Sequence, residues 1–83
     1  MRFHLVVSRE VQNKARQIFA EQLKRTGLRD YELEVRSFSD DEVEMEATLV
    51  NTVPDEGAGS ALVERLGVLP GARQAFWSTS SRG

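Results

Sequence analysis

Charged side chains at every second position of two neighbouring segments are the clearest candidates for chemistry in this chain. In an extended segment, alternate side chains point to the same face, so these groups would share one surface. Converging carboxylate oxygens suit Mg²⁺ or Ca²⁺, although on a flat, hydrated sheet they bind weakly. The same surface suits a basic partner, or it is a solvated face whose charges prevent sheet aggregation. The charged positions are Glu32, Glu34, Arg36, Glu44 and Glu46.

Other residues of catalytic type are few and scattered. His4 is the only histidine, and no cysteine is present, which excludes disulfides and thiolate metal sites. We expect His4 to be a surface residue on the outer side of a strand. Residues 57–60, Gly-Ala-Gly-Ser, resemble a phosphate loop, but no lysine follows and Asp55 and Glu56 adjoin them. We interpret them as a helix entry, and we expect no catalytic residue, no cofactor and no metal, hence no enzyme.

Composition narrows the class of protein. The chain has 83 residues with a net charge of −2, of which 29% are charged and 40% hydrophobic, as expected for one small soluble domain. No apolar run approaches the roughly 20 residues of a membrane span. Glutamates on a sheet face would repel phosphates, whereas RNA-recognition sheets carry aromatic and basic residues there. We therefore expect no nucleic-acid partner and no direct membrane span in this chain.

Hydrophobic periodicity predicts the elements that position these residues. Residues 2–8 alternate as a strand, and Ser8 is placed to cap a following helix that ends at Gly27. A hairpin follows over residues 30–50, with its reversal at Ser39-Asp40-Asp41. If Phe38 pairs with Glu42, Arg36 lies opposite Glu44 and Glu34 opposite Glu46, one attractive and one repulsive pair.

The second half of the chain predicts a loop, a shorter helix and a last strand. Residues 52–57 contain Pro and Gly and predict a loop. A shorter helix should run from about residue 55 or 60 to Leu66 and stop at Gly67, and a turn at Pro70-Gly71 should precede a strand over 72–79. Phe76 and Trp77 must point to opposite faces of that strand. Trp77 either fills the core or joins Val6 and Val50 as an exposed docking patch, and the sequence leaves both readings open.

The resulting order is β-α-β-β-α-β. It predicts an α+β, ferredoxin-like fold in which a four-stranded antiparallel sheet carries two helices on one face, with strands one and three in the centre. Residues 1–79 would form a single domain, and residues 80–83 a flexible tail.

The element order, the segment Glu-Val-Glu-Met-Glu-Ala at 42–47 and the ending Leu-Pro-Gly-Ala-Arg-Gln-Ala-Phe-Trp at 69–77 resemble the C-terminal domain of MgtC/SapB membrane proteins. That family commonly ends in Pro-Gly-Val, two residues, Val, any residue and Trp. In this chain Ala72 and Ala75 stand at the two valine positions.

The resemblance implies an ACT-like variant of the ferredoxin-like fold on the cytoplasmic side of a bacterial inner membrane, beneath a hydrophobic N-terminal domain. The family is linked to growth at low magnesium and to survival of intracellular pathogens inside macrophages. The residues associated with its activity lie mainly in the membrane domain, so none is carried over as catalytic. ACT domains that bind amino acids have a glycine-containing turn after the first strand, whereas this chain has Ser8-Arg9-Glu10 there.

We therefore expect a non-catalytic regulatory or protein-interaction domain, the soluble C-terminal part of an MgtC-like membrane protein. Its expected partners are the membrane domain of the parent protein, another protein, or a second copy in a weak homodimer. The alternative is a domain that senses a small ligand or divalent cation with its acidic sheet face. The expected interaction surface consists of Glu32, Glu34, Arg36, Glu44, Glu46 and Trp77.

Overall fold

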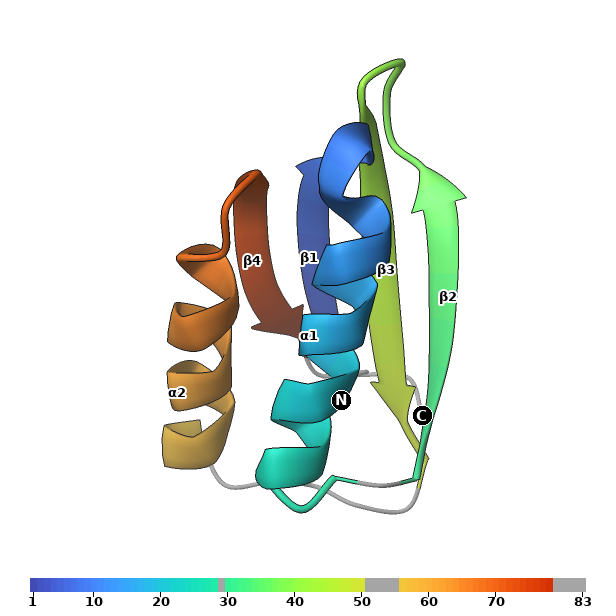
Figure 1. Ribbon diagram of the computed structural model, residues 1–83. Coiled ribbons are helices and arrows are strands. Elements are labelled where there is room, and N and C mark those ends of the chain that lie inside the picture. The colour runs from blue at the N-terminus through green and yellow to red at the C-terminus, as the bar shows by residue number, and fades with distance from the viewer. Residues whose placement is uncertain (29, 51–55, 79–83) are drawn as a thin grey trace.

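The chain forms two layers, a four-stranded sheet and a pair of helices that lie together on one of its faces (Figure 1). The computed structural model describes residues 1–28, 30–50 and 56–78. The predicted tail at 80–83 and most of the predicted loop at 52–57 lie outside these ranges. The elements are β1 (Arg2–Ser8), a 3-10 turn η1 (Arg9–Val11), α1 (Gln12–Arg25), β2 (Tyr31–Ser37), β3 (Glu42–Leu49), α2 (Glu56–Gly67) and β4 (Ala72–Ser78).

All neighbouring strands are antiparallel and follow the order β2-β3-β1-β4. The central positions of β1 and β3 confirm the predicted ferredoxin-like topology. Each helix connects two strands that are not adjacent, so both crossovers place their helix on the same side of the sheet.

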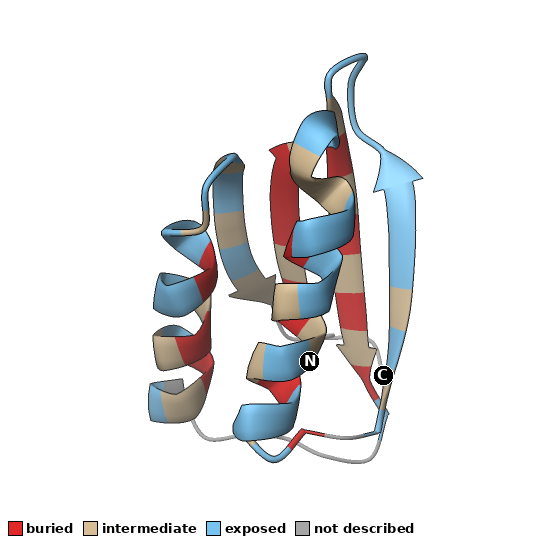
Figure 2. Cartoon of the chain, in the orientation of Figure 1, coloured by how far each residue is buried: buried red, intermediate tan, exposed pale blue. Residues whose placement is uncertain are grey.

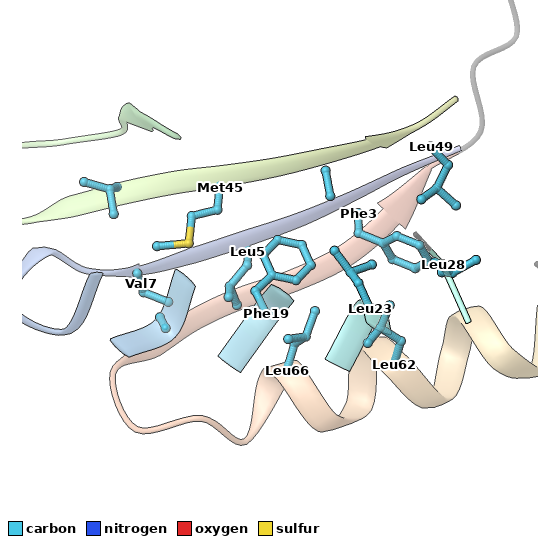
Figure 3. Packing of buried hydrophobic residues seen from close by; sticks show 13 residues of the cluster. Phe3, Leu5, Val7, Phe19, Leu23, Leu28, Met45, Leu49, Leu62 and Leu66 are labelled. Atoms are coloured by element: carbon cyan, nitrogen blue, oxygen red, sulfur yellow. The ribbon is translucent and has the colours of Figure 1, made fainter. Parts of the chain in front are cut away.

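The core lies between the sheet and the helices (Figure 3). Alternate residues of β1 and β3 point to it, and both helices turn a leucine-rich face toward it. Figure 2 shows this division as red central strands behind two helices whose outer faces are pale blue. The central members of the core are Phe3, Leu5, Val7, Phe19, Leu23, Val43, Met45, Leu62 and Leu66.

The end of α1 follows the prediction, and its start does not. The amide of Leu28 donates to the Leu23 carbonyl at 2.9 Å and that of Gly27 donates to Lys24 at 3.0 Å, with Gly27 at a φ of 85°. These two bonds satisfy the last carbonyls of the helix and fold Leu28 back into the core. The predicted cap is wrong, because Ser8 makes no side-chain capping bond and η1 comes between it and α1.

The β2–β3 hairpin has the predicted register. Arg36 pairs with Glu44 and Glu34 with Glu46, while the Phe38 amide donates to the Glu42 carbonyl at 3.0 Å. Arg9, which directly follows β1, donates hydrogen bonds to the turn of this hairpin. Its side chain donates to the Asp40 carbonyl at 3.1 Å, to Ser39 O at 3.0 Å and to Ser37 Oγ at 2.9 Å.

The turn before β4 requires glycine at position 71. Gly71 has a φ of 85°, and a Cβ built there would lie 2.6 Å from Cγ2 of Val11. Gly67, predicted to stop α2, is the last residue of that helix and has no positive φ.

We expect Gly71→Ala to lower the free energy of unfolding by roughly 1–3 kcal/mol, because the new methyl group meets both a strained backbone conformation and the Val11 side chain. Urea denaturation followed by circular dichroism would measure this. Gly67→Ala is the matched control, since its Cβ would contact nothing within 4 Å and helix propensity should raise stability by up to about 1 kcal/mol. Equal stability of both variants would contradict this account of the turn.

Candidate functional site

The face of the sheet that the helices do not cover is the candidate site. Because β2 and β3 alternate, Leu33, Val43 and Met45 point toward the helices while the charged residues between them point the other way. Within β2 and β3, this outer face carries five glutamates and one arginine. The glutamates are Glu32, Glu34, Glu42, Glu44 and Glu46.

Arg36 sits at the centre of these carboxylates. Its Nη2 lies 2.9 Å from Oε1 of Glu46 and 3.1 Å from Oε1 of Glu34, and its Nε lies 3.9 Å from Oε1 of Glu44. The directly opposed pair of Glu34 and Glu46 would repel, as the sequence predicted. The Arg36 guanidinium is bonded to both members and turns this repulsion into a net attraction, because its planar N–H donors reach two carboxylates at once.

His4 extends the network onto the central strand β1. Its Nδ1 lies 3.5 Å from Oε2 of Glu44 and 3.6 Å from Oε2 of Glu46, and its Nε2 lies 3.2 Å from Oγ of Ser78. The ring stacks on Phe76 with centroids 4.5 Å apart and planes 10° apart. Arg36 on β2 therefore bonds Glu46, while the buried Nδ1 of His4 on β1 lies beside Glu44 and Glu46 without a hydrogen-bond partner among the described residues.

His4 is the site residue that sequence reasoning missed. We expected a surface histidine, yet its side chain is only 12% exposed. The strand pairings bring it opposite Glu46 on one side and Phe76 on the other. The burial of His4 could have been predicted from the central position expected for the first strand. An outward side chain on a central strand lies between side chains of the two adjacent strands on the same face.

Trp77 does not belong to this face, so the prediction that it shares one surface with the five charged residues is wrong. Its ring packs on the helix side, where Cε2 lies 3.8 Å from the point that a Cβ atom would occupy at Gly59 of α2. Its neighbour Phe76 takes the outer face instead. Val6 was expected in an exposed apolar patch, but it is only 1% exposed, whereas Val50 is 56% exposed. No outer-face patch therefore joins Trp77, Val6 and Val50.

The charged side chains of this face form ion pairs with one another. No group of three His, Cys, Asp or Glu side chains in the described part of the chain has a geometry that could hold a metal ion. The carboxylates nearest to one another are already paired with Arg36 and contacted by His4. What this face presents is a pattern of charge fixed in position by neighbouring strands.

Comparison with known proteins agrees with this fold. The model of the MgtC/SapB C-terminal domain family matches residues 2–77, which span all four strands and both helices. The chain belongs to this family. A comparison with curated proteins found no match.

A solved structure to which this MgtC/SapB C-terminal domain is similar is the solution structure of the C-terminal domain of the MgtC protein from Mycobacterium tuberculosis. The TM-score is 0.73 at 14% sequence identity, over 93% of this chain and 82% of that chain. At this identity the likeness concerns the fold alone, and it confirms the predicted fold class. Among the described residues, no helix is long and apolar enough to cross a membrane.

We expect Arg36→Gln to lower the free energy of unfolding by roughly 0.5–1 kcal/mol, because three carboxylates lose their shared counter-charge on a surface that water still reaches. Thermal and urea denaturation would measure it. In about 1 M NaCl the difference from the unmodified chain should shrink, since salt screens the remaining repulsion. Arg16→Gln on the exposed side of α1 is the control and should change stability by less than about 0.5 kcal/mol. A salt-independent loss in the Arg36 variant would contradict the electrostatic explanation.

Proposed function

We propose that this chain is a non-catalytic regulatory domain that acts through protein–protein contact as the soluble C-terminal part of an MgtC-like membrane protein. Its place would be the cytoplasmic side of a bacterial inner membrane. Through that parent protein it would contribute to growth at low magnesium and to survival of intracellular bacteria inside macrophages. The observation that carries the interaction role is the fixed charge pattern of the outer sheet face.

A surface of this kind favours recognition because its side chains are ordered before binding. Glu46 is held by a 2.9 Å bond from Arg36 on β2, and the side chains of Glu44 and Glu46 are only 20% and 12% exposed. Side chains that are already held in one geometry lose less conformational entropy when a partner docks. The pattern is also specific, since carboxylates at fixed spacing match only a partner with basic groups at the same spacing.

The charge balance of this face indicates a basic partner. On β2 and β3, the five glutamates outnumber the single arginine. Part of this surplus is offset by Arg73 on β4, whose Nε lies 3.5 Å from Oε2 of Glu42. Glu32 on β2, for which the described part of the chain shows no ion pair, remains most available to arginine or lysine side chains of the parent's membrane domain or of another protein.

The second candidate is a sensor of a small ligand or divalent cation, and the convergence of Glu44, Glu46 and His4 is the observation that favours it. Against it stands Arg36, whose guanidinium occupies the position between Glu34 and Glu46 that a cation would need. A cation would have to displace a bonded arginine on a hydrated sheet, which weakens binding. The interaction role therefore ranks first.

For the interaction role we expect that a parent protein carrying Glu44→Gln and Glu46→Gln together loses growth in magnesium-limited medium at unchanged protein abundance. These changes remove the charges while keeping side-chain size, so partner contact should weaken without loss of the fold. Circular dichroism of the isolated variant chain would check the fold. The control is Glu10→Gln with Glu21→Gln on the helix side, which should grow normally. Normal growth of the outer-face variant would refute the role proposed for this surface.

For the sensor alternative we expect that titrating MgCl₂ or CaCl₂ to about 10 mM leaves the backbone amide signals of residues 32–46 unchanged, because the Arg36 guanidinium already occupies the position between Glu34 and Glu46. Heteronuclear NMR would follow these signals. Thermal unfolding measured with the same salts should also be unchanged relative to NaCl of equal ionic strength. Saturable shifts confined to β2 and β3 would instead establish the sensor.

A further inference from the structure

The imidazole of His4 carries a buried polar atom, Nδ1, that makes no hydrogen bond among the described residues. A buried polar atom without a partner costs free energy, so most such atoms in proteins are paired. Two carboxylate oxygens lie close to it, Oε2 of Glu44 at 3.5 Å and Oε2 of Glu46 at 3.6 Å. Both distances are slightly too long for a hydrogen bond, so Nδ1 lies just out of reach of two strong acceptors.

The two carboxylates that face Nδ1 come from β3 and share one cation on their other side. Arg36, on β2, bonds Oε1 of Glu46 at 2.9 Å and lies 3.9 Å from Oε1 of Glu44. The Oε2 atom of each glutamate is the one directed toward His4. The side chains of Glu44 and Glu46 are only 20% and 12% exposed, so water screens their charges less than on an open surface.

The neighbours of the His4 ring on the other strands and along β1 carry no negative charge. On β4, Phe76 stacks on the ring, and Oγ of Ser78 lies 3.2 Å from Nε2. On β1, the adjacent outward positions are Arg2, which is exposed, and Val6, which is 1% exposed. Among the described residues, the acidic groups beside His4 therefore come from β3 alone.

These surroundings favour a proton on Nδ1. A carboxylate oxygen can only accept a hydrogen bond, and a ring nitrogen without a proton can also only accept one. A bare Nδ1 would therefore direct its lone pair at two negative charges. With the proton on Nδ1, the neutral ring of His4 uses Nε2 as the acceptor, and the Ser78 hydroxyl donates to it.

A second proton, on Nε2, fits the same surroundings. The Ser78 hydroxyl can turn from donor to acceptor, because its oxygen serves both functions. The ring then carries a positive charge next to Glu44 and Glu46, and charge-assisted hydrogen bonds are shorter than the 3.5 Å and 3.6 Å seen here. A small movement of the glutamate side chains would give Nδ1 its partner. Histidine is the side chain whose charge ordinarily changes between about pH 5 and pH 8.

We propose that His4 makes the acidic outer face respond to pH. When the ring takes up its second proton, it bonds Glu44 and Glu46 and places a positive charge between them, so a basic partner binds more weakly as the pH falls. When the ring loses that proton, both carboxylates face the partner without this counter-charge. The proposal rests on the interaction role above, and it names a regulation of that surface.

NMR of the His4 ring tests the protonation states without ambiguity, because this is the only histidine of the chain. At about pH 8 the ring ¹⁵N signals of the untagged chain should show the proton on Nδ1. As the pH falls to about 5.5, both nitrogens should become protonated, and the side-chain carboxyl ¹³C signals of Glu44 and Glu46 should shift with the same midpoint. The carboxyl signal of Glu32, on β2, is the control and should not follow that midpoint.

Binding of a basic probe tests the consequence for recognition. For an acetylated hexa-arginine peptide, followed by the amide signals of β2 and β3, we expect the Kd to rise at least about twofold between about pH 7.5 and about pH 5.5. His4→Gln, which has no charge to gain, should bind the peptide with the same Kd at both pH values. Glu10→Gln on the helix side is the matched control and should keep the pH dependence. Circular dichroism would confirm that both variants are folded.

Several results would overturn the proposal. These are a neutral ring that carries its proton on Nε2, a ring whose titration leaves the carboxyl signals of Glu44 and Glu46 in place, or a peptide affinity of the unmodified chain that does not change with pH. A ring that stays neutral down to about pH 5.5, combined with lost growth of the Glu44 and Glu46 variant, would reject the pH response and keep the interaction role. A ring that titrates together with both carboxylates, combined with normal growth of that variant, would keep the proton response of His4 and reject the interaction role.

Discussion

Burial of one sheet face by two helices is the constraint on which the rest of this structure depends. The period of two in β1 and β3 sends Phe3, Leu5 and Met45 to the same side, and that side needs an apolar cover. Both crossover helices supply it, since each carries its apolar stripe toward the strands. Among the described residues no helix covers the opposite face, and the side chains that β2 and β3 direct there are largely charged.

The charge of the outer face is paired across strands. Opposed glutamates alone would cost stability, and Arg36 removes that cost by bonding Glu34 and Glu46 together. His4, stacked on Phe76, lies beside Glu44 and Glu46 on the side of β1. The result is a surface that stays soluble and at the same time has a defined shape. Such a surface presents its charged side chains at fixed positions.

The edges of the sheet differ for local reasons. β4 packs under α2 through Trp77 and carries the register shift opposite Val6 and Val7. β2 extends beyond the helix layer and is held mainly by β3 and, at the hairpin reversal, by Arg9. Its backbone keeps one register with β3, and its outer face carries Glu32, Glu34 and Arg36.

Much of the fold could be predicted from local patterns. The alternation over residues 31–49 predicted the hairpin, its register and the opposed charges, because turn geometry and side-chain period act between residues that are close in sequence. Gly27 and Leu28 predicted the end of α1 for the same reason. The third strand and the ending 69–77 resemble the MgtC/SapB C-terminal domain and predicted the family. The family match over residues 2–77 confirms this prediction.

What the sequence by itself determined is thus the element order, the helix-facing residues of the central strands and the acidic character of one face. The tertiary structure alone decided where His4, Val6, Trp77 and Arg9 lie. His4 contacts Ser78, 74 positions away, and Arg9 reaches Asp40 across 31 positions. Contacts at such separations depend on which strands become neighbours and on a register shift inside one pair, and no local period carries that information.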